Sequence, residues 1–213
     1  MRFKDKIMKT NCKHWDAIFS GTEDQDLGWY EKNASQTLKL LKLVPGLKKA
    51  RVFIPGAGTS VLIEELLLKC AEITVNDISA EALSRVKKRV NDKKGKIDFL
   101  CRDISRPLPR TLPKADIWID RAVLHFLRDK DAINGYFRNV RSFLKPCGYA
   151  IFLEFSKTGA SKCAGLPLHR YSVAELSKKL GPSFELISHF DYTFINPNGD
   201  PRPYIYTLFR KIK

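Results

Sequence analysis

Residues 51–60, RVFIPGAGTS, decide the fold of this 213-residue chain. They form an apolar run that breaks into a turn with glycines at positions 56 and 58 and then opens a helix. Glycine lets the backbone come close to a ligand, and the start of the helix presents free N–H groups and the positive end of its dipole. An acidic residue, Asp77, follows the next apolar segment, 71–76, about twenty residues on, where a ribose hydroxyl would need an acceptor. The stretch therefore predicts a strand, turn and helix that bind a nucleotide-like ligand.

Strands and helices alternate after this turn, which is the pattern of a parallel sheet covered by helices on both faces. After the strand that begins at Arg51, we expect further strands over 73–75, 97–101, 115–119 and 148–155. We expect helices over 61–68, 79–90, 133–144 and 172–180. These elements place the chain in the α/β class.

The two ends of the chain follow different patterns. Residues 184–194 and 204–208 alternate in polarity around a turn at 196–199, which predicts an antiparallel hairpin. Ahead of the glycine turn, residues 1–12 are basic and polar, and we expect a loose arm there. Amphipathic helices are expected over 14–21 and from Ser35 to the Pro45-Gly46 stop.

The composition is that of an ordinary globular protein of one domain. No apolar run approaches the ~18 residues of a membrane helix, and no signal-peptide core follows the basic N-terminus, so we expect a cytoplasmic protein without a membrane partner. Five cysteines are scattered without C-x-x-C spacing, and we expect no metal site.

The formal net charge of +15 is large for this size. It is densest over 85–96, where two interpretations remain open. The cations can form the solvated face of an amphipathic helix, or they can attract an acidic protein, a nucleic acid or an anionic surface. Arginine-rich motifs with interleaved aromatic residues, which would favour nucleic acid, are not evident. The sequence does not indicate an oligomeric state.

Three carboxylates stand at or just beyond the ends of consecutive predicted strands: Asp77, Asp103 and Asp120. The carboxyl ends of parallel strands form the ligand crevice of an open sheet. These carboxylates argue against a polyphosphate and suit a ligand with hydroxyls, an amine and a positive charge. A dinucleotide dehydrogenase is disfavoured because Val61 stands where the third glycine of that fingerprint should be.

The order of elements resembles a class I S-adenosylmethionine-dependent methyltransferase. Residues 52–60 and 117–122 are similar to segments of thiopurine-methyltransferase-like proteins. Four further segments resemble a group of small bacterial methyltransferases of unassigned substrate: His14-Trp-Asp16, Trp29-Tyr30, 120–127 and 165–171. The resemblance implies a doubly wound, seven-stranded, Rossmann-like sheet that is mostly parallel and ends in the antiparallel hairpin. It also implies a single methyltransferase domain over 1–213, with an N-terminal helical lid segment (1–47) and a cofactor-binding core (48–213).

The resemblance also implies which residues hold S-adenosylmethionine. The glycine turn would face the amino-acid end of the cofactor, Asp77 the ribose, Asp103 and Ile104 the adenine, and Asp120 and Arg121 the methionine moiety. The full set of expected cofactor-binding residues is Trp15, Trp29, Gly56, Ala57, Gly58, Asp77, Ile78, Asp103, Ile104, Asp120 and Arg121. The tryptophans can be packing anchors or a cover over the ligand. Ile54 departs from the pattern, because many methyltransferases carry an acid there that holds the cofactor's ammonium group.

The predicted activity is methyl transfer to a nucleophile, with a small-molecule substrate favoured over a protein. The alternatives are a lysine on an acidic protein partner and a cofactor-binding protein that has lost catalysis. Transfer from a sulfonium needs positioning more than acid–base groups, and a base matters only for a protonated acceptor. Candidate catalytic residues near the mouth of the crevice are Asp120, His125, Glu154 and His169. For His125, between Leu124 and Phe126, packing in the core remains an alternative.

Overall fold

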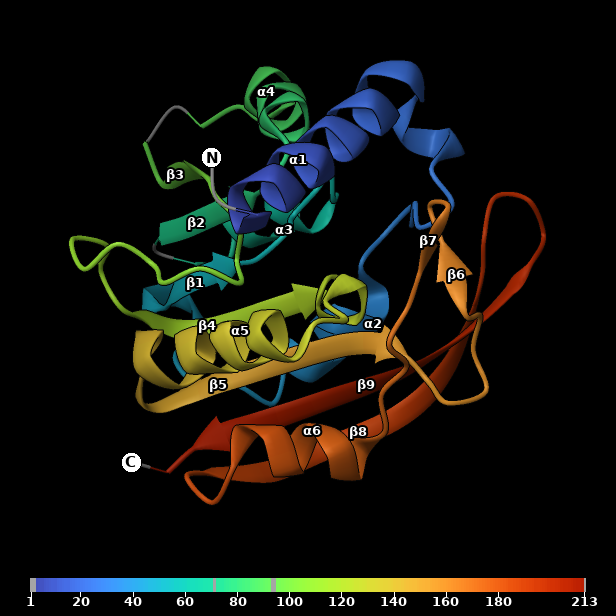
Figure 1. Ribbon diagram of the computed structural model, residues 1–213. Coiled ribbons are helices and arrows are strands. Elements are labelled where there is room, and N and C mark those ends of the chain that lie inside the picture. Colours follow the sequence, from blue (N-terminus) through green and yellow to red (C-terminus); the bar gives the residue numbers. More distant parts are fainter. Residues whose placement is uncertain (1–2, 71, 93–94, 213) are drawn as a thin grey trace.

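The computed structural model describes residues 3–70, 72–92 and 95–212. One seven-stranded sheet crosses the molecule in the order β3-β2-β1-β4-β5-β9-β8 (Figure 1). β1 to β5 run parallel, and β9 runs antiparallel to both of its neighbours. The strands are β1 (Arg51–Ile54), β2 (Glu72–Asp77), β3 (Ile97–Cys101), β4 (Ala115–Arg121), β5 (Leu144–Phe155), β8 (Phe184–Ile195) and β9 (Pro201–Lys211). The predicted fold class is confirmed, including the C-terminal hairpin.

Alternate residues of the central strands build two cores, one on each face of the sheet. On one face, Val52 and Ile54 of β1 pack with residues of α2, α3 and α4. On the other face, Phe53 packs with residues of α5 and α6, which lie in front of the sheet in Figure 1. Side chains alternate in direction along a strand, so a strand with both faces covered is apolar throughout. The helices are α1 (Phe3–Gly21), α2 (Ser35–Leu41), α3 (Leu62–Leu67), α4 (Ala80–Arg89), α5 (Lys130–Phe143) and α6 (Val173–Leu180).

The three longer core helices begin at side-chain caps. Ser79, Asp129 and Ser172 each accept a hydrogen bond from a backbone N–H of the first turn of α4, α5 and α6, respectively. Such caps satisfy N–H groups that have no partner within the helix. They explain why these helices begin within a residue or two of their predicted starts, except α5, which begins three residues earlier.

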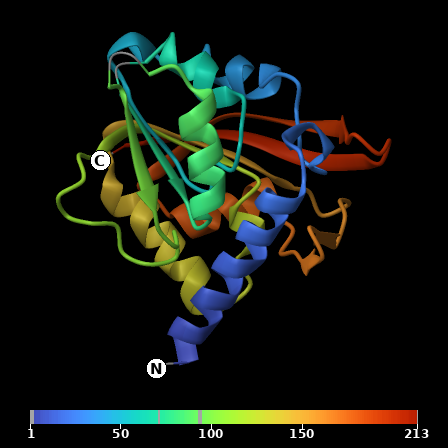
Figure 2. The same ribbon diagram turned by 90° about the horizontal axis from the view of Figure 1, so that it is seen from above.

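The structure corrects the prediction of a loose N-terminal arm. α1 already begins at Phe3, and residues 1 and 2 lie outside the described residues. The segment contains no proline or glycine before Gly21, so nothing in its backbone chemistry stops the helix. Figures 1 and 2 show α1 beside α4, and its later residues contact that helix.

Two further boundaries differ from the prediction. β5 begins at Leu144, directly after α5, and it bulges between Leu144 and Tyr149, which pair with Ala115 and Ile117 of β4. The segment expected as a loop after β5 contains a short separate hairpin of β6 (Lys162–Cys163) and β7 (Leu166–Pro167). Within the described residues, no helix has the length and apolar character needed to cross a bilayer.

Candidate functional site

A cavity of about 610 Å³ opens at the carboxyl ends of the parallel strands. Its volume lies in the range of small-molecule sites. The wall is built by the glycine turn after β1, the residues that follow β2, β3 and β4, the ends of β5 and β9, and the lid segment. The cavity therefore occupies the place that the strand order predicts for a ligand.

The glycine turn brings bare backbone to the cavity. Gly56 and Gly58 have positive φ angles of 48° and 52°, which glycine adopts at no steric cost. A Cβ atom on Gly56 would lie 2.4 Å from Cγ2 of Val123, in the segment after β4. The N–H of Ala57 donates a 2.8 Å hydrogen bond to the carbonyl of Asn76 and so ties the turn to β2. A side chain at position 56 would therefore push the turn away from β4.

Asp77 braces the turn from the end of β2. Its carboxylate accepts hydrogen bonds from the N–H of Gly58 at 2.7 Å and from the N–H of Ser79 at 2.8 Å. Burial raises the pKa of Asp77 to about 6, and the backbone N–H groups oppose that rise. Asp77 also lines the cavity, together with Ile78, and Asp103 and Ile104 line it at the end of β3. The glycine turn after β1 and the side chains that follow β2 and β3 thus lie one after another along one wall.

Aromatic rings of the N-terminal segment expected as a lid (1–47) line part of the cavity, together with Phe126. The Trp15 ring lies 5.8 Å from that of Trp29 and 4.8 Å from that of Phe126, measured between centroids, in edge-on geometry. Phe19 is buried in the same cluster. Trp15 and Trp29 therefore pack against each other, and both also line the cavity.

The neighbours of Trp15 fasten α1 on either side. The ring Nε2 of His14 donates a 3.1 Å hydrogen bond to the carbonyl of Ala164, between β6 and β7. Asp16 accepts a 2.6 Å hydrogen bond from the hydroxyl of Ser79, the cap residue of α4. The motif His14-Trp-Asp16 therefore joins three parts of the molecule over the cavity.

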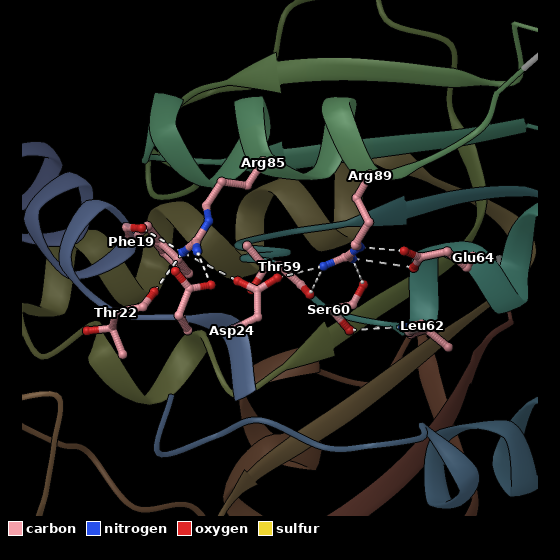
Figure 3. A network of polar contacts seen from close by, with 10 residues as sticks. Phe19, Thr22, Asp24, Thr59, Ser60, Leu62, Glu64, Arg85 and Arg89 are labelled. Carbon is pink, nitrogen blue, oxygen red and sulfur yellow. Dashed lines mark hydrogen bonds and ion pairs between the residues drawn. The ribbon is translucent and has the colours of Figure 1, made fainter. Parts of the chain in front are cut away.

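Lys87 and Lys88 of the basic run are exposed, as a solvated face requires, whereas Arg85 and Arg89 of the same helix α4 bind neighbouring segments. Arg85 donates hydrogen bonds to the carbonyls of Phe19 and Thr22, where α1 ends. Arg89 donates to the carbonyls of Thr59 and Ser60 at 2.9 and 3.1 Å, and pairs with Glu64 and Asp24 (Figure 3). Oδ1 of Asp24 also lies 3.4 Å from Nη1 of Arg85. Two arginines one helical turn apart thus connect the lid segment to the glycine turn.

A second ion pair lies across the cavity. Arg121, at the end of β4, pairs with Glu31 of the lid segment and also donates to the hydroxyl of Ser60. The side chains of Arg121 and Glu31 are only 12% and 13% exposed, and both line the cavity. The second carboxylate oxygen of Glu31 lies 3.5 Å from the Tyr206 hydroxyl on β9.

The structure places Asp120 and Glu154 away from the cavity wall, in contrast to the prediction. Both are fully buried. Asp120 accepts hydrogen bonds from the N–H groups of Val123 and Leu124 and from the Tyr136 hydroxyl. Burial raises the pKa of both carboxyl groups well above their usual values. Their polar partners lie inside the protein, which draws these carboxyl groups inward at the strand ends.

His125 and His169 are also held by protein groups. Nδ1 of His125 lies 2.7 Å from Oε2 of Glu154, and its other ring nitrogen is buried. Burial lowers the pKa of His125 to about 3, so the ring is neutral. His125 does line the cavity, whereas His169 lies outside the wall, with its Nε2 2.6 Å from Oε1 of Glu175 on α6. The four candidate catalytic residues therefore do not gather around one open point.

Comparisons with known proteins agree with this architecture. Residues 55–150 match a family model described as a methyltransferase domain. The chain is 30% identical over 104 residues to malonyl-[acyl-carrier protein] O-methyltransferase 2 of Ilyobacter polytropus, an alignment that covers 48% of this chain and 38% of that protein.

Solved structures with a similar fold align with nearly the whole length of this chain. An S-adenosylmethionine-dependent methyltransferase from Anabaena variabilis has a TM-score of 0.78 at 13% identity, over 96% of this chain and 95% of that one. The 1,6-didemethyltoxoflavin-N1-methyltransferase of Burkholderia thailandensis, with bound 1,6-didemethyltoxoflavin and S-adenosylhomocysteine, has a TM-score of 0.66 at 17% identity. That match covers 98% of this chain and 87% of the other. The chain thus has the fold of class I S-adenosylmethionine-dependent methyltransferases, and residues 55–150 match a methyltransferase domain.

Measured against that class, the cavity contains most of the expected cofactor-binding residues. Ten line it: Trp15, Trp29, Gly56, Ala57, Gly58, Asp77, Ile78, Asp103, Ile104 and Arg121. Asp120 does not. The sequence did not predict a role at the site for Glu31 or Arg89, because their partners lie far away in the chain. It also predicted no role for Asp16, although this residue is part of the motif His14-Trp-Asp16. In the part of the chain that the structure describes, no group of three or more His, Cys, Asp or Glu residues is arranged to hold a metal ion.

Proposed function

We propose that this protein transfers a methyl group from S-adenosylmethionine to the nucleophilic atom of a small molecule. The observation that carries this proposal is the single cavity that joins the glycine turn, Asp77 and Asp103 along successive strand ends. The domain match and the fold support the same activity.

The cavity residues fit the cofactor group by group. The carboxylate of Asp77 is placed to accept hydrogen bonds from the ribose hydroxyls, while its N–H partners keep it in position. Ile78 and Ile104 offer apolar contacts to the adenine, and Asp103 a polar one. Gly56 and Gly58 let the ligand approach the backbone. The cofactor supplies an activated methyl group on a positively charged sulfur.

The remaining task of the protein is to position the acceptor and exclude water. The aromatic cluster around Trp15 and Trp29 covers the site, and a covered site strengthens electrostatic contacts inside it. Alignment of acceptor and methyl group can supply a large part of the barrier reduction. We propose that the buried pair of His125 and Glu154 holds the 3₁₀ turn at 124–126 in place, because both ring nitrogens of His125 are enclosed by protein.

A small acceptor is favoured over a protein side chain because contacts of three consecutive residues, 14–16, hold α1 beside the cavity, with Trp15 in its wall. The methyltransferase from Burkholderia thailandensis, with a similar fold, was solved with 1,6-didemethyltoxoflavin bound. The net charge of +15 is the observation that favours the second candidate, a lysine on an acidic protein.

Two measurements test the proposal. In calorimetry, we expect S-adenosylmethionine and S-adenosylhomocysteine to bind and NAD not to bind; binding of NAD alone would refute the proposal. Next, S-adenosylmethionine labelled in the methyl group is added with the protein to an extract of the source cells. We expect label in the small-molecule fraction. Label in the protein fraction supports the second candidate, and label in no fraction, despite tight binding, supports a protein that binds the cofactor without catalysis.

A further inference from the structure

The end of β1 lacks an acidic residue. Ile54 is apolar and 1% exposed, and it lines the base of the cavity. If the cofactor binds as proposed above, the ammonium group at its methionine end must find its negative partner elsewhere. The inference that follows rests on that proposed function.

The strand order shows where this partner must lie. Asp77 stands at the end of β2, and Arg121 at the end of β4, with β1 hydrogen-bonded between these two strands. A ligand whose ribose contacts Asp77, and whose chain continues along the glycine turn, therefore extends toward Arg121. Arg121 also donates to Ser60, directly after the turn, so it lies within reach of this end of the ligand.

The other cavity carboxylates near the turn already have strong partners. Asp24 is paired with both Arg85 and Arg89, at 3.4 and 2.9 Å. Asp77 accepts from two backbone N–H groups, and Asp103 lies at the far end of the wall, after β3. Glu31 is also paired, with Arg121 through one oxygen, but its other oxygen has only the long 3.5 Å contact with Tyr206.

We propose that Glu31 and Arg121 together bind the amino-acid end of the cofactor. Glu31 accepts hydrogen bonds from the ammonium group, and Arg121 donates to the carboxylate. An amino acid carries one charge of each sign, so it can insert between the two side chains and give each a new partner. The site stays neutral as a whole, which matters because an unpaired charge at this depth is costly. Glu31 thus supplies from the lid segment the negative charge that Ile54 does not provide from the sheet.

This arrangement also links the ligand to the cover of the site. Glu31 comes two residues after Trp29, whose ring belongs to the aromatic cluster over the cavity. A ligand that holds Glu31 therefore holds the segment that carries Trp29. A ligand without an amino-acid end gains nothing from this contact.

The test compares two ligands in one variant. S-adenosylhomocysteine has the amino-acid end, whereas 5′-methylthioadenosine keeps the adenosine and the thioether and lacks it. We expect Glu31→Gln to weaken binding of S-adenosylhomocysteine about tenfold or more in calorimetry, since hydrogen bonds between charged groups are the strong ones. Binding of 5′-methylthioadenosine should change less than about twofold, which also shows that the variant is folded. The matched control is Asp26→Asn, which removes an exposed carboxylate of the same segment and should change neither affinity.

The outcomes separate this inference from the proposed function. If Glu31→Gln binds S-adenosylhomocysteine as the natural protein does, or loses both ligands equally, the assignment of Glu31 is wrong while the cofactor site stands. If the natural protein binds neither ligand, the proposed function fails, and the assignment fails with it.

Discussion

Replacement of Gly56 by alanine tests how closely the glycine turn is fitted to β4. The change has two separable costs. At a φ of +48°, an alanine pays the strain of the left-handed region, about 1–2 kcal/mol. Its Cβ would also lie 2.4 and 2.8 Å from the two methyl carbons of Val123, where carbon atoms normally stay about 3.5–4.0 Å apart. Forcing such an overlap costs about 1–3 kcal/mol more.

The sum is a loss of about 2–5 kcal/mol in the free energy of unfolding, measured by urea denaturation. For a chain of this length, that corresponds to a fall in Tm of about 4–20 °C. Gly46→Ala is the matched control, because Gly46 has a φ of +71° and no atom within 4 Å of its Cβ position. It should cost only the strain, about 1–2 kcal/mol.

A double mutant isolates the overlap. Val123→Ala removes both crowding methyl groups and leaves its Cβ at 3.2 Å from the new one. Gly56→Ala combined with Val123→Ala should therefore be more stable than the sum of the single changes predicts, by about 1–3 kcal/mol. If Gly56→Ala costs no more than Gly46→Ala, Val123 does not press on the turn, and the reasoning is refuted.

Three further predictions concern the supports of the site. Burial raises the pKa of Asp77 to about 6, so the folded protein binds this proton more tightly than the unfolded chain, and the free energy of unfolding should fall as pH rises from about 4 to 6. The affinity for S-adenosylhomocysteine should rise over the same range as the carboxylate forms. An Asp77→Asn variant in which stability and affinity kept the same pH dependence would contradict this prediction. Asp16→Ala should cost about 1–2 kcal/mol by calorimetric unfolding, because it removes the acceptor for Ser79 at the start of α4; an unchanged Tm would show that this contact is dispensable. Arg89→Gln should speed hydrogen exchange of lid-segment amides and release of S-adenosylhomocysteine, whereas its exposed neighbour Lys88→Gln should do neither; equal effects would point to charge alone.

The sheet and the turn could be predicted because their signals are local. β1 is an apolar run that ends at two glycines, and β3 coincides with its predicted range, 97–101. The alternation of polar and apolar residues over 184–208 likewise predicts a hairpin, since its two strands are close to each other in the chain. α1 was missed before residue 14 because lysines and other polar residues outnumber the apolar ones in its first turns.

The candidate site could be predicted only in part, because the strand ends look alike in sequence. Asp77 and Asp120 both follow apolar strands, yet Asp77 lines the cavity and Asp120 turns inward to Tyr136. Which direction a carboxylate takes depends on partners that the fold brings to it. Glu31 shows the same limit, because its partner Arg121 lies far along the chain and nothing in the loop around Glu31 indicates that they meet.

The placing of His14, Trp15 and Asp16 has a consequence for how ligands enter and leave. Successive side chains of a helix point about 100° apart, so α1 is held at three places around its circumference: the β6–β7 hairpin, the aromatic cluster and the cap of α4. A helix held in this way cannot roll or slide by part of a turn without losing all three contacts together. A ligand that enters or leaves past α1 therefore requires all three contacts to break.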